Sequence, residues 1–156
     1  MATVSAARAA STLPVAGHGF AGNMKAAWGT YTHASNLAAA TVIEYCRVPK
    51  GATIIGGYWC ATDLDTGTEE LDIDIGWAAN GDEIADTDGF GNLGTLTGDV
   101  SVHLGVASIW IPFQGVLFTA GPKTFNAETV LQALVNTDAA TGGTGQSTMV
   151  AYYTMP

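Results

Sequence analysis

A strict alternation of side chains between residues 70 and 77 constrains the fold more than any other feature of this sequence. Every second residue of this stretch, written ELDIDIGW, is apolar, and the residues between are acidic or glycine. The apolar set is Leu71, Ile73, Ile75 and Trp77, and the intervening set is Glu70, Asp72, Asp74 and Gly76. Successive side chains of a β-strand point to opposite faces of its sheet, so this period of two predicts a strand with one buried and one solvated face. We expect the acidic residues to meet water or the basic groups of a partner.

The chain from residue 24 onward continues in short β-prone runs separated by Gly, Pro, Asn and Asp. Short strands at such spacing, with turn residues between them, are typical of a sandwich or a barrel. We predict one all-β domain over residues 24–156, an antiparallel β-sandwich for which a jelly roll is one arrangement. Strands are expected at 25–32, 39–48, 52–61, 69–77, 100–104, 107–113, 128–136 and 147–155.

Successive strands in such a domain are often joined by tight turns, and we expect three hairpins here. Turns at 49–51 and 64–68 would place 52–61 beside both of its chain neighbours, and 128–136 would pair with 147–155. The stretch NAETVLQALVN, residues 126–136, also fits an amphipathic helix capped by Asn126, but the turn-rich ATGGTGQS after it favours a strand.

Two segments lie outside this pattern. Residues 1–23 are rich in Ala, Gly and Ser and predict an extended N-terminal arm that lies on another copy or another protein. Residues 79–94 predict a long Gly- and Asp-rich loop with one helical turn near 82–85. Apolar side chains in such segments have no obvious core to join, so we expect them to contact a partner, with folding back onto the same subunit as the alternative for Phe90. The set is Leu13, Pro14, Val15, Phe20, Ile84 and Phe90.

Charge and hydropathy exclude several kinds of partner. The net charge is −9, and the five Lys and Arg residues are scattered from Arg8 to Lys123, which argues against binding nucleic acid. No apolar run approaches the ~20 residues of a membrane span, and the N-terminus lacks the apolar segment of a signal peptide. We therefore predict synthesis in a reducing cytoplasm, with Cys46 and Cys60 as buried free thiols.

Metal and catalytic signals are weak. The pairs Asp63 with Asp65 and Asp86 with Asp88 have the spacing of calcium loops, but neither continues to a terminal Glu, and Asp and Gly are ordinary turn residues. Asp72 and Asp74 lie on one exposed strand without a reason for a raised pKa. We predict no cofactor and no enzymatic activity.

The histidines and aromatic residues give no stronger signal. The residues His18, His33 and His103 have no metal-like spacing and are expected at the surface. The aromatic residues of the apolar strands, Tyr58, Trp59, Trp77 and Trp110, are expected in the core.

Three stretches resemble small structural proteins of tailed bacteriophages. They are VPKGATIIGGYWCATDLDTGTEELDIDIGW (48–77), GDEIADTDGFGN (81–92) and TFNAETVLQALVNTDAATGGTGQSTMVAYYTMP (124–156). This resemblance to β-sandwich decoration, or cement, proteins implies a virion protein that binds the major capsid protein on the capsid exterior and bridges capsomers, most simply as a homotrimer. The alternative is a carbohydrate- or calcium-dependent binding module of a head fibre or tail that recognises the host.

Overall fold

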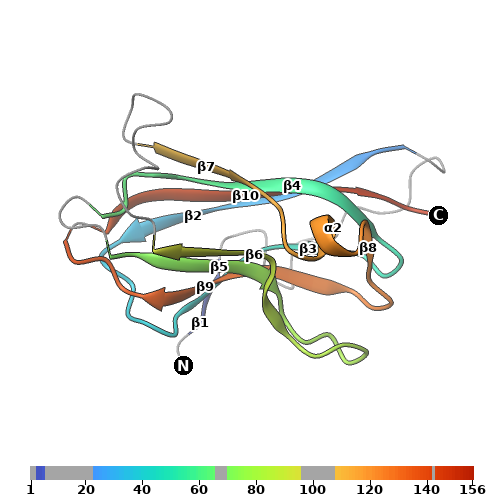
Figure 1. The fold of residues 1–156 in the computed structure, drawn as a ribbon, viewed down its shortest axis with the longest axis horizontal. Helices are drawn as coiled ribbons and strands as arrows, with labels where there is room; N and C mark the ends of the chain where they lie inside the picture. Colours follow the sequence, from blue (N-terminus) through green and yellow to red (C-terminus); the bar gives the residue numbers. More distant parts are fainter. Residues whose placement is uncertain (1–2, 6–22, 66–69, 96–107, 142) are drawn as a thin grey trace.

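The strands form two sheets that pack face to face in a computed structural model describing residues 3–5, 23–65, 70–95, 108–141 and 143–156 (Figure 1). Sheet A contains, in spatial order, β1 (Thr3–Ser5), β3 (Val42–Val48), β9 (Thr129–Thr137), β5 (Asp72–Trp77) and β6 (Asp86–Thr95). Sheet B contains β2 (Lys25–Ala34), β10 (Thr144–Thr154), β4 (Thr53–Thr62) and β7 (Ser108–Pro112), and the short β8 (Lys123–Thr124) pairs with β4.

The chain changes sheet at nearly every connection. Strands β2, β4, β7 and β10 belong to sheet B, while β3, β5, β6 and β9 belong to sheet A. The pairs are antiparallel except for β1 with β3, which is parallel. Without the short β1 and β8, two four-stranded antiparallel sheets connected in this order form a jelly roll. The predicted all-β sandwich is therefore confirmed, with the jelly-roll arrangement.

The three predicted hairpins are wrong, although the strands on both sides of each turn are present. The strand predicted at 100–104 lies outside the described residues. The turn at 49–51 leads from β3 in sheet A to β4 in sheet B, and the next connection returns to β5 in sheet A. Strand β9 confirms the choice of strand over helix at 128–136, but its neighbours are β3 and β5 rather than β10. Period-two patterning identifies which face of a strand is buried. A hairpin and a connection to the opposite sheet both bury that face, so the pattern does not distinguish them.

The predicted loop at 79–94 contains the edge strand β6 from Asp86 onward. Its pairing with β5 is interrupted, because Ile75 pairs with Gly91 and Trp77 with Asp86, so residues 87–90 oppose Gly76 alone. This bulge explains why the Gly- and Asp-rich sequence was not predicted to form a strand. Residues 81–83 form a bend, not the expected helical turn.

Part of the predicted N-terminal arm lies in sheet A. Residues 3–5 form β1 and pair with β3 in the register Thr3 to Val42, so part of the predicted arm is a strand of sheet A. The contact residues predicted at Leu13, Pro14, Val15 and Phe20 lie outside the described residues.

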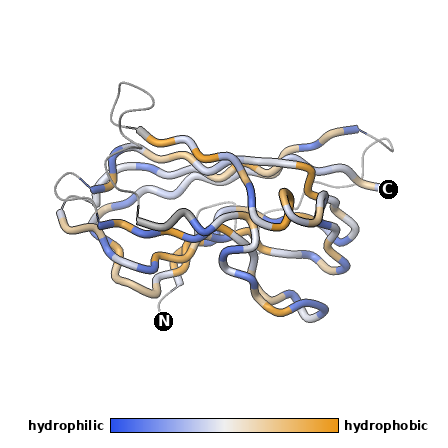
Figure 2. Tube along the Cα trace, viewed as in Figure 1, coloured by the Kyte–Doolittle hydropathy of each residue, from blue (hydrophilic) through white to orange (hydrophobic). Residues whose placement is uncertain are grey.

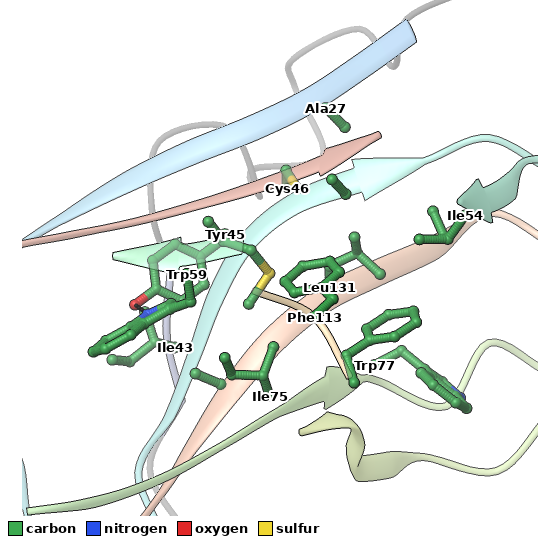
Figure 3. Close-up of a cluster of buried hydrophobic side chains, with 14 of the residues drawn as sticks. Ala27, Ile43, Tyr45, Cys46, Ile54, Trp59, Ile75, Trp77, Phe113 and Leu131 are labelled. Carbon is green, nitrogen blue, oxygen red and sulfur yellow. Dashed lines mark hydrogen bonds between the residues drawn. The ribbon is translucent and has the colours of Figure 1, made fainter. Parts of the chain in front are cut away.

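The core lies between the two sheets, and apolar and polar positions alternate along the strands (Figure 2). Side chains from both sheets fill it, among them Trp59, Ile75, Phe113 and Leu131 (Figure 3). Both cysteines are free, with Cys46 buried and Cys60 half-buried. The one described helix, α2 (Val116–Thr119), has four residues, and no helix in the described ranges could cross a membrane.

A polar chain runs through one part of this core. His33 Nε2 lies 2.7 Å from Ser147 Oγ, which lies 2.6 Å from the hydroxyl of Tyr45. His33 is only 5% exposed, so its predicted surface position is wrong. Burial lowers the pKa of His33 to about 4, and the imidazole is neutral at neutral pH.

Candidate interaction surfaces

Strand β5 buries the apolar face that its alternation predicts, but its acidic face is only partly solvated. Glu70 is exposed and Asp72 is half-buried, whereas Asp74 is 6% exposed. The cover comes from the first residues of β6, since a Cβ atom on Gly76 would clash with the carbonyl oxygen of Asp86. The prediction that Asp74 faces solvent is therefore wrong, because an edge strand with a bulge lies close against this part of sheet A.

Burial changes the ionisation of the carboxylates in this region. The pKa of Asp74 is raised by burial and by the neighbouring charges of Asp72 and Asp88, although a hydrogen bond with Asn136 opposes the change. The pKa of Asp86 is also raised, again by burial first and then by Asp88. Asp74 Oδ1 has no hydrogen-bond partner among the described residues.

Asp65 has a structural role that its spacing did not reveal. Its side chain is 7% exposed and accepts hydrogen bonds from four backbone N–H groups. The donors are Glu70 at 2.8 Å, Leu71 at 3.2 Å, and Ala140 and Thr141 at 3.3 Å each. Burial alone would raise the pKa of Asp65, but these donors outweigh burial and the pKa is lowered. The carboxylate thus joins the start of β5 to the loop between β9 and β10.

The four carboxylates predicted as weak calcium ligands lie in different surroundings. Both oxygens of Asp65 accept backbone N–H groups, and Asp63 Oδ1 accepts the N–H of Asp65 at 3.1 Å. Asp86 and Asp88 lie at the start of β6. No group of three or more His, Cys, Asp or Glu side chains in the described part of the chain is placed to hold a metal ion.

One end of the sandwich exposes two large apolar side chains. Ile84, in the loop between β5 and β6, is 87% exposed, and Phe118, on α2, is 89% exposed. We call the segments 78–85 and 116–128 the loop end, which lies on the right in Figure 1. Ile84 was predicted as a contact residue and is accessible. Phe118 was missed, although it belongs to a short apolar run, VLFT, bounded by Gly115 and Gly121.

Polar contacts join the two segments of the loop end to each other and to β9. Glu83 Oε2 lies 2.5 Å from Nζ of Lys123, and Asn80 Nδ2 donates to Thr129 Oγ1 over 2.8 Å. The backbone N–H groups of Asp82 and Glu83 donate to the side-chain oxygen of Asn80. The loop therefore presents Ile84 from an internally bonded support.

Phe90 is not accessible to a partner. It is 1% exposed, its ring stacks on Phe113 with centroids 4.9 Å apart, and it meets Trp77 edge to face at 5.0 Å. The bulge at 87–90 turns this side chain into the core. Phe90 thus follows the alternative of folding back onto its own subunit.

The outer face of sheet B carries four aromatic residues, and two of them, Tyr58 and Trp110, were wrongly expected in the core. Trp110 is 53% exposed and Trp28 is 45% exposed, while Tyr58 and Tyr152 are half-buried. The pairing aligns Trp28 with Val150 and Val150 with Tyr58 across three strands. We call the surface formed by Trp28, Tyr58, Trp110, Val150 and Tyr152 the aromatic face. Trp110 was misplaced because SIWIP is apolar at almost every position, so periodicity did not identify its outward side.

Comparison with solved structures finds the same fold in virus shells. A chain of the cyanophage Pam1 capsid asymmetric unit aligns with a TM-score of 0.64 and 22% identity over 94% of both chains. A chain from the capsid of Ralstonia phage GP4 aligns with a TM-score of 0.74 and 15% identity over 99% of both chains. The fold is shared with proteins of phage capsids.

A third likeness is weaker and concerns the acidic stable capsid structure of Helicobacter pylori bacteriophage KHP30. It has a TM-score of 0.52 and 15% identity and covers 86% of this chain and 94% of that one. No protein-family model matches the chain. No curated protein sequence matches it either. The resemblance to small phage structural proteins is thus supported at the level of the fold.

Proposed function

We propose that this chain is a structural virion protein that binds the outside of a phage capsid and stabilises the shell by bridging neighbouring capsomers. The observation that carries the proposal is the likeness in fold to proteins of two phage capsids along almost the whole chain. The partner is the major capsid protein, and the chain acts as a homo-oligomer, most simply a trimer. It is made in the host cytoplasm and performs no chemistry.

The loop end is the surface we assign to the shell. Two side chains that are 87% and 89% exposed have little contact with their own subunit, and burying them against a partner would release water from apolar surface. Together with Leu13, Pro14, Val15 and Phe20 of the N-terminal segment, Ile84 and Phe118 supply the apolar contacts. Contacts of ~800 Å² per partner, repeated over a shell, add up even where each is weak.

Sedimentation with empty shells tests the proposal. Purified protein is mixed with undecorated shells of the virus that encodes it, and the pelleted fraction gives the apparent affinity. Ile84→Ser and Phe118→Ser are each expected to weaken binding by about 5- to 30-fold, because a truncated buried contact costs roughly 1 to 2 kcal/mol. Deletion of residues 1–20, which also removes the edge strand β1, is expected to abolish decoration while the other strands stay folded.

The matched control is Ala38→Ser, which adds the same hydroxyl at an exposed position in the connection between β2 and β3. This variant should bind as wild type does. Absence of wild-type binding to shells, or binding that survives both the deletion and the loop-end substitutions, contradicts the proposal.

A further inference from the structure

The aromatic face differs in charge from the rest of the molecule. Strands β2, β4, β7 and β10 contain no Asp or Glu, although the chain carries 14 acidic residues and a net charge of −9. In contrast, β3, β5 and β6 of sheet A contain Glu44, Asp72, Asp74, Asp86 and Asp88. The carboxylates are therefore distributed over sheet A and the loops.

The side chains of this face have the composition of an interface core. The centres of such interfaces are enriched in Trp and Tyr and depleted of Asp, Glu and Lys. The residues beside the aromatic rings are neutral and small, as in the pair Thr30 and Thr148, whose hydroxyl oxygens lie 2.8 Å apart. Four large rings thus stand on the broad neutral outer face of sheet B, and this sheet lies at the top of Figure 1.

The size of the face also fits a protein partner. Its strands contain 10, 11, 10 and 5 residues. Because alternate side chains point outward, they present roughly 18 side chains, close to the roughly 20 residues per side at which stable interfaces begin.

The ring geometry argues against an extended sugar chain as the occupant. Tyr58 is tilted by 38° from Trp110, with ring centroids 5.5 Å apart, and by 59° from Tyr152, at 6.3 Å. A flat polysaccharide stacks on rings that share a plane, and these three do not share one. Packed, mutually tilted rings instead form an uneven surface, and the side chains of another protein can pack against it with good shape complementarity.

The distribution of charge favours a second copy of this chain over a basic protein as the partner of the aromatic face. Two copies of a chain with net charge −9 repel each other most strongly where their carboxylates meet. The aromatic face is the part of the described strands where a second copy can approach without bringing carboxylates of its own strands into the contact. A basic partner would be drawn to sheet A and the loops instead.

We propose that the aromatic face is the surface through which copies of this chain bind one another. Because the same face of each copy meets, this contact is two-fold, and it joins copies in addition to the contacts within the trimer proposed above. Tyr58 and Trp110 lie at its centre, with Trp28 and Tyr152 beside them. The association depends on these side chains and not on the loop end, so self-association and shell binding are separate properties.

Light scattering on purified protein, without shells, tests this over a wide range of protein concentration. Wild-type protein is expected to form an oligomer. The double variant Tyr58→Ser, Trp110→Ser is expected to raise the dissociation constant by about 100-fold or more, as for truncated aromatic contacts at an interface centre. Phe118→Ser, which removes an exposed ring at the loop end, is the matched control and should associate as wild type does.

A second measurement on the wild-type protein covers the case in which the double variant does not fold. Cys60 lies between the buried residues Trp59 and Ala61 and pairs with Trp110, so it faces outward on the same surface, whereas Cys46 is buried in the core. Alkylation of Cys60 is expected to accelerate as dilution dissociates the oligomer, and Cys46 serves as the unreactive reference.

Three results of these two experiments would overturn the inference. They are a wild-type protein that is monomeric at all concentrations, a folded double variant that associates as wild type does, and alkylation of Cys60 that is independent of concentration. Binding of a soluble neutral glucan that is lost in the double variant would assign the face to a sugar and overturn it as well. Loss of shell binding alone would contradict the proposed function and leave this inference standing.

Discussion

The indole N–H of Trp59, on β4, donates a 2.9 Å hydrogen bond to the hydroxyl oxygen of Tyr45, on β3, and so connects the two sheets through the core. The same hydroxyl lies 2.6 Å from Ser147 Oγ on β10. Tyr45 and Trp59 are both fully buried. A polar group in this position is tolerated because each of its hydrogen-bonding atoms has a partner.

Tyr45→Phe should therefore be costly. The substitution leaves the Trp59 N–H without its acceptor, and an unsatisfied buried group costs roughly 1 to 3 kcal/mol. We expect the free energy of unfolding, measured in urea, to fall by about 2 kcal/mol. The matched control is Tyr153→Phe, because the hydroxyl of Tyr153 is buried without a hydrogen-bond partner in the described residues. Equal losses in the two variants would contradict the role of the network.

His33 makes the stability of the protein depend on pH. Its pKa is about 4 in the folded protein because of burial, compared with 6.5 for the free side chain. The unfolded chain therefore binds the proton more tightly, and stability present above pH 6.5 is lost as the pH falls toward 4. We expect His33 to contribute a loss of about 2 kcal/mol over this range.

Comparison with His33→Gln isolates this contribution. The variant keeps a side chain able to bond Ser147 but has no titrating group at this position, so its unfolding free energy should fall less between pH 7 and pH 4 than that of wild type. An NMR titration of the His33 imidazole gives the pKa directly. A midpoint near 6.5 in the folded protein would contradict the prediction.

Asp65→Asn tests the carboxylate that joins two loops. An amide offers one acceptor and a donor where four backbone N–H groups converge, so we expect the free energy of unfolding at pH 7 to fall by about 2 to 3 kcal/mol. Asp138→Asn removes the same charge at an exposed site nearby and should change stability by less than about 0.5 kcal/mol.

The pH dependence of this effect has a defined sign. Because the folded-state pKa of Asp65 lies below its ordinary value of 3.8, its contribution is present above that value and lost as the pH falls through the folded-state pKa. The difference between wild type and Asp65→Asn, measured by urea unfolding, should therefore shrink in strong acid. A difference that stays constant with pH would show that the charge is not what stabilises the loops.

The sequence predicted which residues form strands better than it predicted which strands pair. The alternation from Leu71 to Trp77 gives the buried face of β5 because that pattern depends only on the pleat of one strand. Pairing depends on where each connection leads, and a turn such as 49–51 joins strands of opposite sheets with the same residues that a hairpin uses. Jelly-roll topology is therefore not readable from period and turn residues alone.

The exposure of a side chain at the candidate surfaces was predictable only where the residue differed in hydropathy from its neighbours in the sequence. Ile84 is apolar in a polar loop, and the structure exposes it. Phe90 has the same local signal, but a bulge against β5 turns it inward, which is a tertiary effect. Trp110 lies in a run without alternation, so its outward orientation follows from its neighbours in sheet B rather than from its own strand.

Asp74→Asn is expected to stabilise the protein at neutral pH. The carboxylate is 6% exposed, and burial followed by the charges of Asp72 and Asp88 raises its pKa, although the hydrogen bond with Asn136 opposes them. A carboxyl group with a raised pKa destabilises the folded state above that pKa, and the penalty disappears as the pH falls and the group binds a proton. Replacing the charge by a neutral amide should add about 1 kcal/mol at pH 7.

The pH dependence of the change in unfolding free energy caused by Asp74→Asn tests this explanation. The gain, measured by urea unfolding, should be largest at pH 7 and should vanish near pH 3, where wild-type Asp74 is protonated. Asp138→Asn, at an exposed position in the connection between β9 and β10, is the matched control and should change stability by less than about 0.5 kcal/mol. Destabilisation at pH 7 would instead mean that the Asp74 charge is compensated in the folded protein, in which case its burial against β6 carries no electrostatic penalty.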